Sequence, residues 1–285
     1  MEKIPAINHF YIEEMSSFDE MWDEKGDLRQ HWTPMVNNLY GIGWREMEAR
    51  QKEASILLKE NGVTYSVYDD PKGLNRTWQL DTIPLIIGES DWAVIDLGLK
   101  QRAYLLNYIL SDIYGERTLI KNGLLPFDLI LNHSGFLRQC NGINIPGNHH
   151  LILYAADIAR GHDGNLWVLN DRTQAPSGAG YALENRSVMA RVLPDLFHRC
   201  HVRRMTGFFS AYHKALISIA PHNKENPRIV ILTPGPRNET YFEHAYLASY
   251  LGYTLVQGDD LTVRDGFVWL KTLGGLEPVD IIIRR

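Results

Sequence analysis

The sequence predicts an α/β fold in which β-hairpins accompany a parallel βαβ unit. The parallel unit is indicated by "NPRIVILTPGPRNETYFEHAYLASYLGYTLVQG", where an apolar strand, a tight loop, a helix and a second strand follow one another. Two Asp-Gly pairs, Asp163-Gly164 and Asp265-Gly266, lie between strand-like segments and predict hairpins, because this dipeptide favours the two-residue hairpin turn. We therefore expect a mixed sheet with hairpins plus a parallel βαβ unit.

The first part of the chain is predicted to be mostly helical. Residues 1–60 carry apolar side chains near helical spacing, and Asn61-Gly62 supplies a stop. Residues 63–68 then alternate in a pattern typical of a strand, and 81–90 predict a short strand or extended segment. Residues 91–114 carry a broad apolar stripe that predicts a long helix.

The second part changes character. Residues 149–171 predict two strands joined by a turn at 162–165, followed by helices over 181–197 and near 207–220. The βαβ unit and a hairpin over 261–272 come next, and an apolar strand begins at Val279. We divide the chain into a helical segment (1–60), a central part with a strand-turn-helix site (61–225) and the start of a βαβ substrate-binding subdomain (226–285).

Composition excludes several classes of protein. With 45% hydrophobic and 22% charged residues, the 285-residue chain is typical of a soluble globular protein. The net charge of -5 gives no general attraction to nucleic acid, and the basic stretch at 198–205 is interpreted as solvated surface. Cys140 and Cys200 lie outside any metal-ligand spacing, and the sequence shows neither a signal peptide nor a membrane span. We expect a cytoplasmic protein without nucleic-acid or membrane partners.

The stretch "LWVLNDRTQAPSGAGYALENR" (166–186) is the first candidate site. Alternation along its strand places Asn170 and Arg172 on one face and Asp171 on the other, unless a bulge brings all three together. A carboxylate such as Asp171 suits Mg²⁺, and an arginine such as Arg172 can clamp a phosphate or carboxylate. Backbone N–H groups of 177–180 near a helix start favour an anion. The alternative is an ordinary turn shaped by Pro and Gly.

The loop "TPGPRNETYFEH" (233–244) is the second candidate site. Open α/β sheets bind ligands at the carboxyl ends of parallel strands, which favours Gly235, Arg237 and Asn238, with Glu243 one turn into the helix. The alternative is a connection in which Asn238 or Thr240 caps the helix.

Other features point less clearly to chemistry. His149 and His150 are adjacent and would point to opposite faces of a strand, so we interpret them as ordinary surface or core residues. Arg138 and Arg160 either face the same cleft as the first site or lie in solvent. The sequence has no Walker-type phosphate loop and no GxSxG motif.

Four stretches, in one order, resemble the circularly permuted ATP-grasp family, type 2. They are "NGVTYSVYDDPKGLNRTW", "LKQRAYLLNYILSDIYGERTLIKNGLLP", "VLNDRTQAPSGAGYALENR" and "ILTPGPRNETYFEHAYLASYLGYTLVQGDDLTVRDGFVWLKT". The family is distantly similar to glutathionylspermidine synthase and to eukaryotic glutathione synthetase. The resemblance implies an ATP-grasp fold and a ligase that uses ATP and Mg²⁺ to activate a carboxylate as an acyl phosphate, which an amine then attacks.

The resemblance also implies roles for individual residues. Better-characterised relatives end the matching strand in an acidic residue, any residue and Asn, whereas this chain has Asn170, Asp171 and Arg172. Asp171 with Asn170 is the implied metal site, and Arg172 and Arg160 are the implied catalytic residues that steady phosphate. The implied contacts to a small-molecule or peptide substrate are Gln174, Ser177, Gly178, Ala179, Gly180, Gly235, Arg237, Asn238 and Glu243.

Family members continue beyond the position that matches Arg285, into the part that carries the nucleotide-binding lysines. We therefore expect an incomplete ATP-grasp-like unit that needs a C-terminal half or a fused helical domain and does not turn over alone. The alternative is a binding or scaffold module that has kept the fold and lost catalysis.

Overall fold

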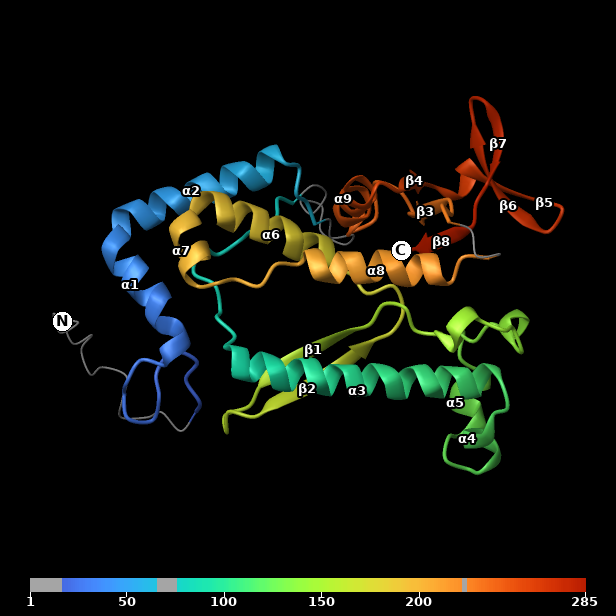
Figure 1. The fold of residues 1–285 in the computed structure, drawn as a ribbon, viewed down its shortest axis with the longest axis horizontal. Coiled ribbons are helices and arrows are strands. Elements are labelled where there is room, and N and C mark those ends of the chain that lie inside the picture. The colour runs from blue at the N-terminus through green and yellow to red at the C-terminus, as the bar shows by residue number, and fades with distance from the viewer. Residues whose placement is uncertain (1–16, 66–75, 222–224) are drawn as a thin grey trace.

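The computed structural model of the chain describes residues 17–65, 76–221 and 225–285 (Figure 1). Its α-helices are α1 (Thr33–Ile42), α2 (Trp44–Glu60), α3 (Glu89–Tyr114), α4 (Thr118–Lys121), α5 (Phe127–Leu131), α6 (Ala179–Val192), α7 (Pro194–Arg199), α8 (Thr206–Ser218) and α9 (Tyr241–Leu251). Short 3-10 helices are η1 (Gln30–Trp32), η2 (Arg138–Cys140), η3 (Pro146–Asn148) and η5 (Gly258–Asp260). Its strands are β1 (Ala155–Arg160), β2 (Leu166–Arg172), β3 (Ile229–Leu232), β4 (Thr254–Val256), β5 (Leu261–Arg264), β6 (Phe267–Thr272), β7 (Gly275–Pro278) and β8 (Ile281–Arg284).

The predicted helices are confirmed where the structure describes them. α1 and α2 fill 33–60, and α2 stops where Asn61-Gly62 was expected to stop it. α3 covers the helix expected over 91–114, and the preceding residues are extended without forming a strand. The helix expected over 181–197 is split into α6 and α7, because Pro194 cannot continue the hydrogen bonds of α6. The second half of the strand expected over 63–68 lies outside the described residues.

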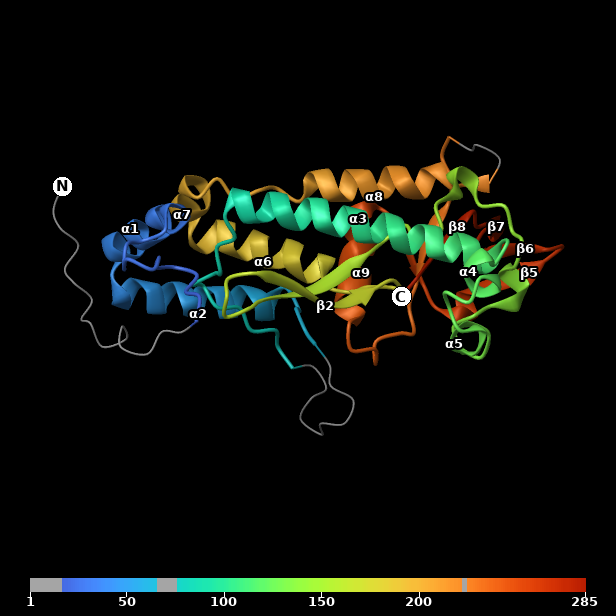
Figure 2. The same cartoon turned by 90° about the horizontal axis from the view of Figure 1, so that it is seen from below.

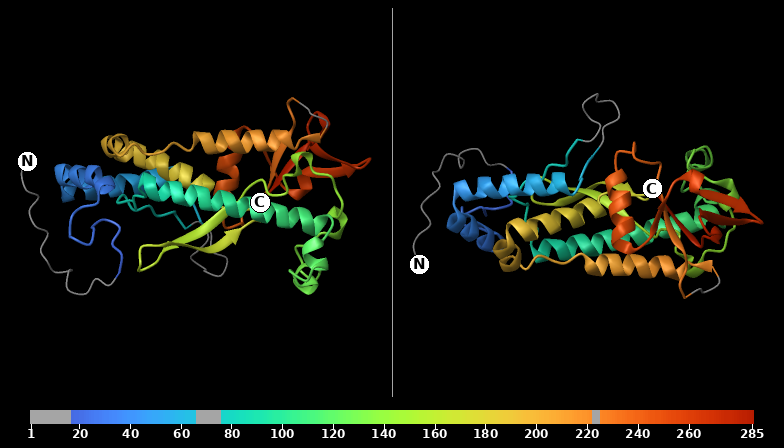
Figure 3. Two further views of the ribbon diagram at one scale, coloured as in Figure 1. Left: turned by 60° about the horizontal axis from the view of Figure 1, so that its bottom comes forward. Right: turned by 90° about the horizontal axis from the view of Figure 1, so that it is seen from above.

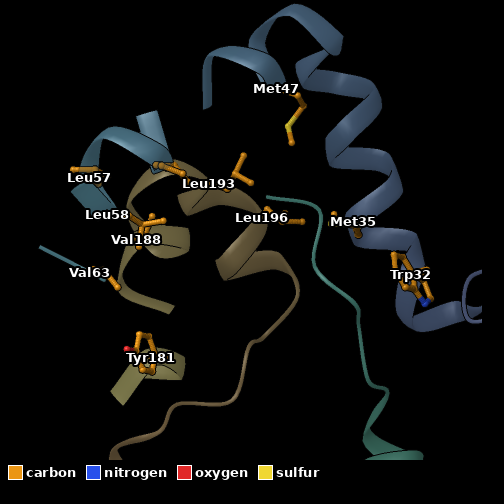
Figure 4. Close-up of a cluster of buried hydrophobic side chains, with 12 residues drawn as sticks. Trp32, Met35, Met47, Leu57, Leu58, Val63, Tyr181, Val188, Leu193 and Leu196 are labelled. Atoms are coloured by element: carbon orange, nitrogen blue, oxygen red, sulfur yellow. The ribbon is translucent and has the colours of Figure 1, made fainter. Parts of the chain in front are cut away.

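One buried cluster joins the N-terminal helices to the middle of the chain (Figure 4). It consists of Trp32, Met35, Met47, Ala54, Leu57, Leu58, Val63, Tyr181, Val188, Val192, Leu193 and Leu196. These side chains come from η1, α1, α2 and Val63 on one side and from the segment of α6 and α7 on the other. The packing therefore crosses the boundary that the sequence suggested at residue 60. It holds α6 against α2.

The β1–β2 hairpin and α3 lie side by side along the edge of the molecule (Figures 1 and 2). The hairpin is antiparallel, as predicted, with its turn at 161–165. Side chains tie it to the helix at both ends, where Arg102 of α3 binds Asp171 and Asp91 of α3 binds Arg160. The hairpin is thus held against α3 rather than added to a larger sheet.

The parallel unit forms a second sheet of order β4-β3-β8, in which β3 pairs in parallel with both neighbours. Ile229 and Ile231 face α8 and α9 across one side, while Val230 packs with Val256 and Leu270 on the other. A sheet that is covered on both faces needs mostly apolar strands, and apart from Thr254 and Arg284 the residues of these three strands are apolar. Figure 3 shows this sheet at the end opposite the N-terminal helices.

A third sheet, of order β5-β6-β7, is antiparallel and contributes Leu270 to the covered face of the parallel sheet. It contains the predicted Asp265-Gly266 hairpin and a further strand, β7, that the sequence pattern did not show. The α/β class, the hairpins and the parallel βαβ unit are therefore confirmed. The strands form three separate sheets rather than one mixed sheet, because the hairpins pack face-on against helix or sheet.

Candidate functional site

The end of β2 carries the first predicted cluster, and a bulge shapes it. The register of β1 and β2 shifts between Asp157 and Ile158, leaving Leu169 as the extra residue. The bulge was expected to let three polar side chains converge. Instead, Asn170 and Arg172 share one face with Asp157, and Asp171 points to the other face, toward α3.

Asp171 is held by two side chains. Arg102 contacts both of its carboxylate oxygens, with Nε 3.0 Å from Oδ1, and the hydroxyl of Tyr154 donates to Oδ1 at 2.5 Å. These hydrogen bonds, Arg102 first, hold the pKa of Asp171 below its usual value, and the same pair raises the pKa of Arg102. The carboxylate is therefore neutralised by the protein itself.

The two residues of the predicted metal site do not lie together in this arrangement. Asn170 lies on the opposite face of the hairpin from Asp171, and its amide is within 3.4 Å of Asp157. Across the described residues, no group of three or more His, Cys, Asp or Glu side chains is placed to hold a metal ion. Mg²⁺ prefers several oxygen ligands around one point, and the pair Asn170 and Asp171 does not supply them.

Arg172 forms a bidentate pair with Asp157 of the neighbouring strand. Its Nε and Nη2 lie 3.0 and 2.8 Å from Oδ2, and about half of the arginine side chain (52%) stays exposed. Tyr65 lies next to it, since the charge of Arg172 acts on the tyrosine hydroxyl, which also hydrogen-bonds to Glu239. Burial, first of all, and then Glu239 raise the pKa of Tyr65.

Arg160 lies elsewhere, which corrects its predicted place beside Arg172. The two arginines sit at opposite ends of the hairpin, separated by about 16 Å at 3.3 Å per strand residue, and on opposite faces. The guanidinium of Arg160 binds Glu20 at 2.6 Å, Asp91 at 2.5 Å and the carbonyl of Gly164 at 3.0 Å. It anchors the hairpin turn to α3 and to the preceding chain, and it does not belong to the candidate site.

The turn that opens α6 holds a carboxylate, and the carboxylate is the protein's own. The amide of Gly178 donates to Glu243 Oε2 at 2.8 Å, and the amide of Gly180 donates to Oε1 at 3.1 Å. Gly178 has a φ of 117°, which L side chains rarely adopt. A Cβ on Gly180 would lie 2.7 Å from Cγ of Glu243. In this structure Glu243 therefore occupies the position at which the sequence placed a substrate carboxylate.

Glu243 also joins the turn to the last strand. Its side chain is fully buried, and Arg285, which follows β8 and is 3% exposed, places Nη2 3.2 Å from Oε1. Nη1 of the same arginine donates to the carbonyl of Pro176 at 2.8 Å. Two amides and one guanidinium therefore compensate the buried charge of Glu243, as a buried carboxylate requires.

The second predicted loop, 233–240, lies at the same place, the carboxyl edge of β3. Gly235 has a φ of 106° and is buried, and a Cβ there would lie 2.7 Å from Oε1 of Gln257. Asn238 accepts hydrogen bonds from the amide and hydroxyl of Thr240, both at 3.0 Å, so it shapes the start of α9 as the alternative interpretation proposed. Arg237 is exposed.

His244 forms the core of this loop. Its Nδ1 lies 2.8 Å from the hydroxyl of Thr233, and its Nε2 lies 3.1 Å from the hydroxyl of Thr240. Burial, with a smaller effect of the Arg285 charge, lowers the pKa of His244 to about 4. The imidazole is therefore neutral at pH 7 and acts as a hydrogen-bonding spacer.

The structure thus joins the two predicted loops through Glu243 and leaves a polar rim above them. We define the rim as Arg172, Gln174, Ser177, Arg237 and Glu239, which are all exposed. The sequence had named the first four. Ala179, another predicted contact, instead packs against the apolar cluster between α8 and α9.

Several partners escaped the sequence-based interpretation. They are Asp157, Arg102, Tyr154, Tyr65 and Arg285, which come from four separate segments that only the folded chain brings to the site. Asp157 lies opposite Asn170 in the hairpin, so it is the partner nearest to the predicted cluster.

A cavity of about 420 Å³ lies at the opposite edge of the parallel sheet, near the first residues of β3 and β4. His213 and Tyr253 hydrogen-bond within it at 2.5 Å, and Arg228 pairs with Glu277. Open α/β sheets bind ligands at the carboxyl ends of their strands, so we place the candidate site at the rim.

Among the described residues, no helix combines the length and the apolar character needed to cross a bilayer.

Comparison with known proteins gives one family. Residues 84–285 match the family described as circularly permuted ATP-grasp type 2. The chain is 39% identical over 278 residues to the uncharacterized protein Rv2567 of Mycobacterium tuberculosis, covering 95% of this chain and 31% of that protein. It is 37% identical over 268 residues to sll0335 of Synechocystis, covering 94% and 56%, and 36% identical over 269 residues to ML0605 of Mycobacterium leprae, covering 94% and 47%.

The chain therefore spans between about a third and just over a half of the length of these relatives. The family match begins five residues before α3 and includes both loops of the candidate site and all three sheets. With more than half of its residues in that match, the chain belongs to the circularly permuted ATP-grasp type 2 family.

Proposed function

We propose that this chain forms the acceptor-binding wall of an ATP-dependent carboxylate–amine ligase that acts through an acyl phosphate. Family membership supports the class, since ATP-grasp proteins generally bind ATP and Mg²⁺. The observation that carries the proposal is the joining of two glycine-containing loops by Glu243 at the carboxyl edge of the parallel sheet. This edge is where folds of this class bind small-molecule ligands.

In the proposed site, the buried layer holds the loops and the rim contacts the ligand. Arg172 is oriented by Asp157 and half exposed, so its guanidinium can meet a substrate carboxylate or phosphate from the solvent side. Arg237 adds a second exposed positive charge on the neighbouring loop. Gln174 and Ser177 supply neutral hydrogen-bonding groups between them.

ATP and Mg²⁺ belong to the proposal as partners of the complete protein. Within the part of the chain that the structure describes, the predicted ligands do not fit a metal ion, because Asp171 is paired with Arg102 and Tyr154 and Asn170 faces the other way. We therefore assign the nucleotide and the metal to polypeptide of the kind that the relatives carry beyond the matched region.

The test is ADP formation by the protein as its gene encodes it, with a panel of amines and carboxylates. Arg172→Ala should lower kcat/KM about 10- to 100-fold, the worth of one charged hydrogen-bonding group. Lys52→Ala removes a cation from α2, far from the rim, and should leave kcat/KM unchanged. Residues 1–285 alone should form no ADP. Equal rates for Arg172→Ala and the parent would contradict the role given to the rim.

A second function, a non-catalytic binding or scaffold module, is favoured by one observation. Both charged residues at the end of β2 are already paired within the protein, Asp171 with Arg102 and Arg172 with Asp157. A module of this kind would bind ATP or the small ligand without turnover. ADP formation with any amine–carboxylate pair would exclude it, and tight binding without ADP would exclude the ligase.

A further inference from the structure

α3 carries an exposed apolar stripe along most of its length. The stripe consists of Val94, Leu97, Tyr104, Leu105 and Tyr108, whose side chains are 66%, 72%, 64%, 58% and 64% exposed. At 100° per residue these positions fall within one arc of about 100°, the width of a helix face that normally packs against a core. Gln101 is the polar residue within that arc.

The opposite side of α3 already has its partners. Ile95 and Ile113 are buried, Arg102 binds Asp171, and the amide of Asn107 donates to the carbonyl of Asn148. The helix is therefore fixed in the fold by one face, while the stripe is presented outward. Figure 2 looks onto α3 with the hairpin beside it.

The stripe differs from ordinary surface exposure of apolar residues. Single exposed apolar side chains are normal, whereas contiguous apolar patches mark interaction sites. The charges beside the stripe are engaged within the chain, since Lys100 pairs with Asp96 on one side and Arg102 with Asp171 on the other. The stripe therefore exposes apolar surface and two tyrosine hydroxyls. Such a surface suits an apolar polypeptide face rather than a charged ligand.

We infer that the stripe is the docking surface for the remaining polypeptide of the family proteins. The relatives match this chain over 94–95% of its length, yet the match fills only 31%, 47% and 56% of theirs. They therefore carry a large amount of further polypeptide. α3 is the first helix of the matched family region, and the stripe is its outward face. The inference stands independently of the ligase proposal, because it concerns packing and not turnover.

The test uses hydroxyl-radical footprinting of the tyrosines in residues 1–285, alone and with the part of sll0335 that lies outside its 268 matched residues. Tyr104 and Tyr108 should be labelled strongly in the chain alone and several-fold less in the mixture. Tyr40 of α1, which is 49% exposed, is the internal control and should stay equally labelled. Leu97→Glu with Leu105→Glu should weaken the complex at least tenfold in Kd, about 1.4 kcal/mol. Lys100→Ala, on the same helix, should leave Kd unchanged.

Three results would overturn the inference. They are the absence of a complex, a complex in which Tyr104 and Tyr108 remain labelled, and protection that rises with the concentration of the chain alone, which would make a second copy the occupant. If the separate sll0335 part does not fold, hydrogen exchange decides instead. The helix aligned with α3 should exchange slowly in intact sll0335 and faster after truncation to its matched residues, and equal rates would refute the docking. None of these readouts depends on ADP formation, so the ligase proposal is tested separately.

Discussion

The two ends of the 170–180 segment use charge in opposite ways. At the α6 end, Glu243 is fully buried and is compensated by two amides and Arg285. At the β2 end, Arg172 and Asp157 form an equally direct ion pair but remain about half exposed. Removing one member of a buried pair leaves an uncompensated charge, whereas an exposed pair is replaced by water. The first end therefore holds the fold, and the second is the end that we propose contacts a ligand.

Glu243→Ala should have the largest effect on stability. It leaves the buried amides of Gly178 and Gly180 without their acceptor and the buried guanidinium of Arg285 without its counter-charge. We expect a loss of about 3–5 kcal/mol in the free energy of unfolding, measured with urea. The control is Glu239→Ala, an exposed carboxylate four residues earlier, which should change it by less than about 0.5 kcal/mol. Similar losses for both variants would remove the contrast between the two ends.

His244 should give the buried end a pH dependence. Its pKa is about 4 in the folded protein and 6.5 ordinarily, so the unfolded chain binds this proton first as the pH falls. The contribution of neutral His244 to the free energy of unfolding is complete above pH 6.5. It is lost between pH 6.5 and about 4, by up to about 3 kcal/mol at 1.36 kcal/mol per pKa unit. His244→Asn, which keeps a polar group near Thr233, should flatten unfolding free energy against pH in this window. An unchanged slope would show that another group titrates.

Gly180→Ala tests how closely α6 approaches Glu243. The new methyl group would lie 2.7 Å from Cγ of Glu243 and 3.4 Å from Cγ of Leu247, so we expect a loss of about 1–3 kcal/mol from overpacking. Gly98→Ala, inside α3, meets nothing within 4 Å and should instead stabilise by about 0.5–1 kcal/mol through helix propensity. Thermal unfolding distinguishes the two directions. Stabilisation by Gly180→Ala would mean that α6 and α9 are further apart.

Asp171→Asn should have the smallest effect on stability, and this effect should disappear at low pH. The pKa of Asp171 is lowered by Arg102 and Tyr154, so its contribution is present above its usual value of 3.8 and is lost as the pH falls below it. The difference in Tm between the parent and Asp171→Asn should be small and constant from pH 7 to 5, and should shrink toward pH 3. A difference that persists unchanged at pH 3 would contradict the ion pair with Arg102.

The sequence predicted most of the local structure, because the signals were local. Periodicity placed α3, the Asp-Gly pairs placed both hairpins, and alternation separated Asp171 from Arg172. Both loops were named as candidate sites, and the fold joins them through Glu243. The local sequence did not indicate which group accepts a hydrogen bond from a given amide or which groups form an ion pair.

Those partners come from distant positions that only packing selects. Glu243 lies 63 residues from Gly180, and Arg102 lies 69 residues from Asp171. A turn whose amides are free and a turn whose amides have an acceptor can have the same local sequence. In the same way, the local sequence around a carboxylate at a strand end does not show whether an arginine pairs with it. The sequence therefore could not show that Asp171 pairs with Arg102 or that Glu243 accepts hydrogen bonds from the amides of Gly178 and Gly180.

Amide hydrogen exchange at Gly178 and Gly180, followed by NMR, tests the central claim most directly. If Glu243 holds the turn, both amides should exchange only with global unfolding in the parent protein, and much faster in Glu243→Gln while the β1–β2 amides keep their protection. If both amides exchange in the parent as fast as those of exposed turns, the turn is open and Glu243 does not occupy it. That result would return these two amides to the ligand.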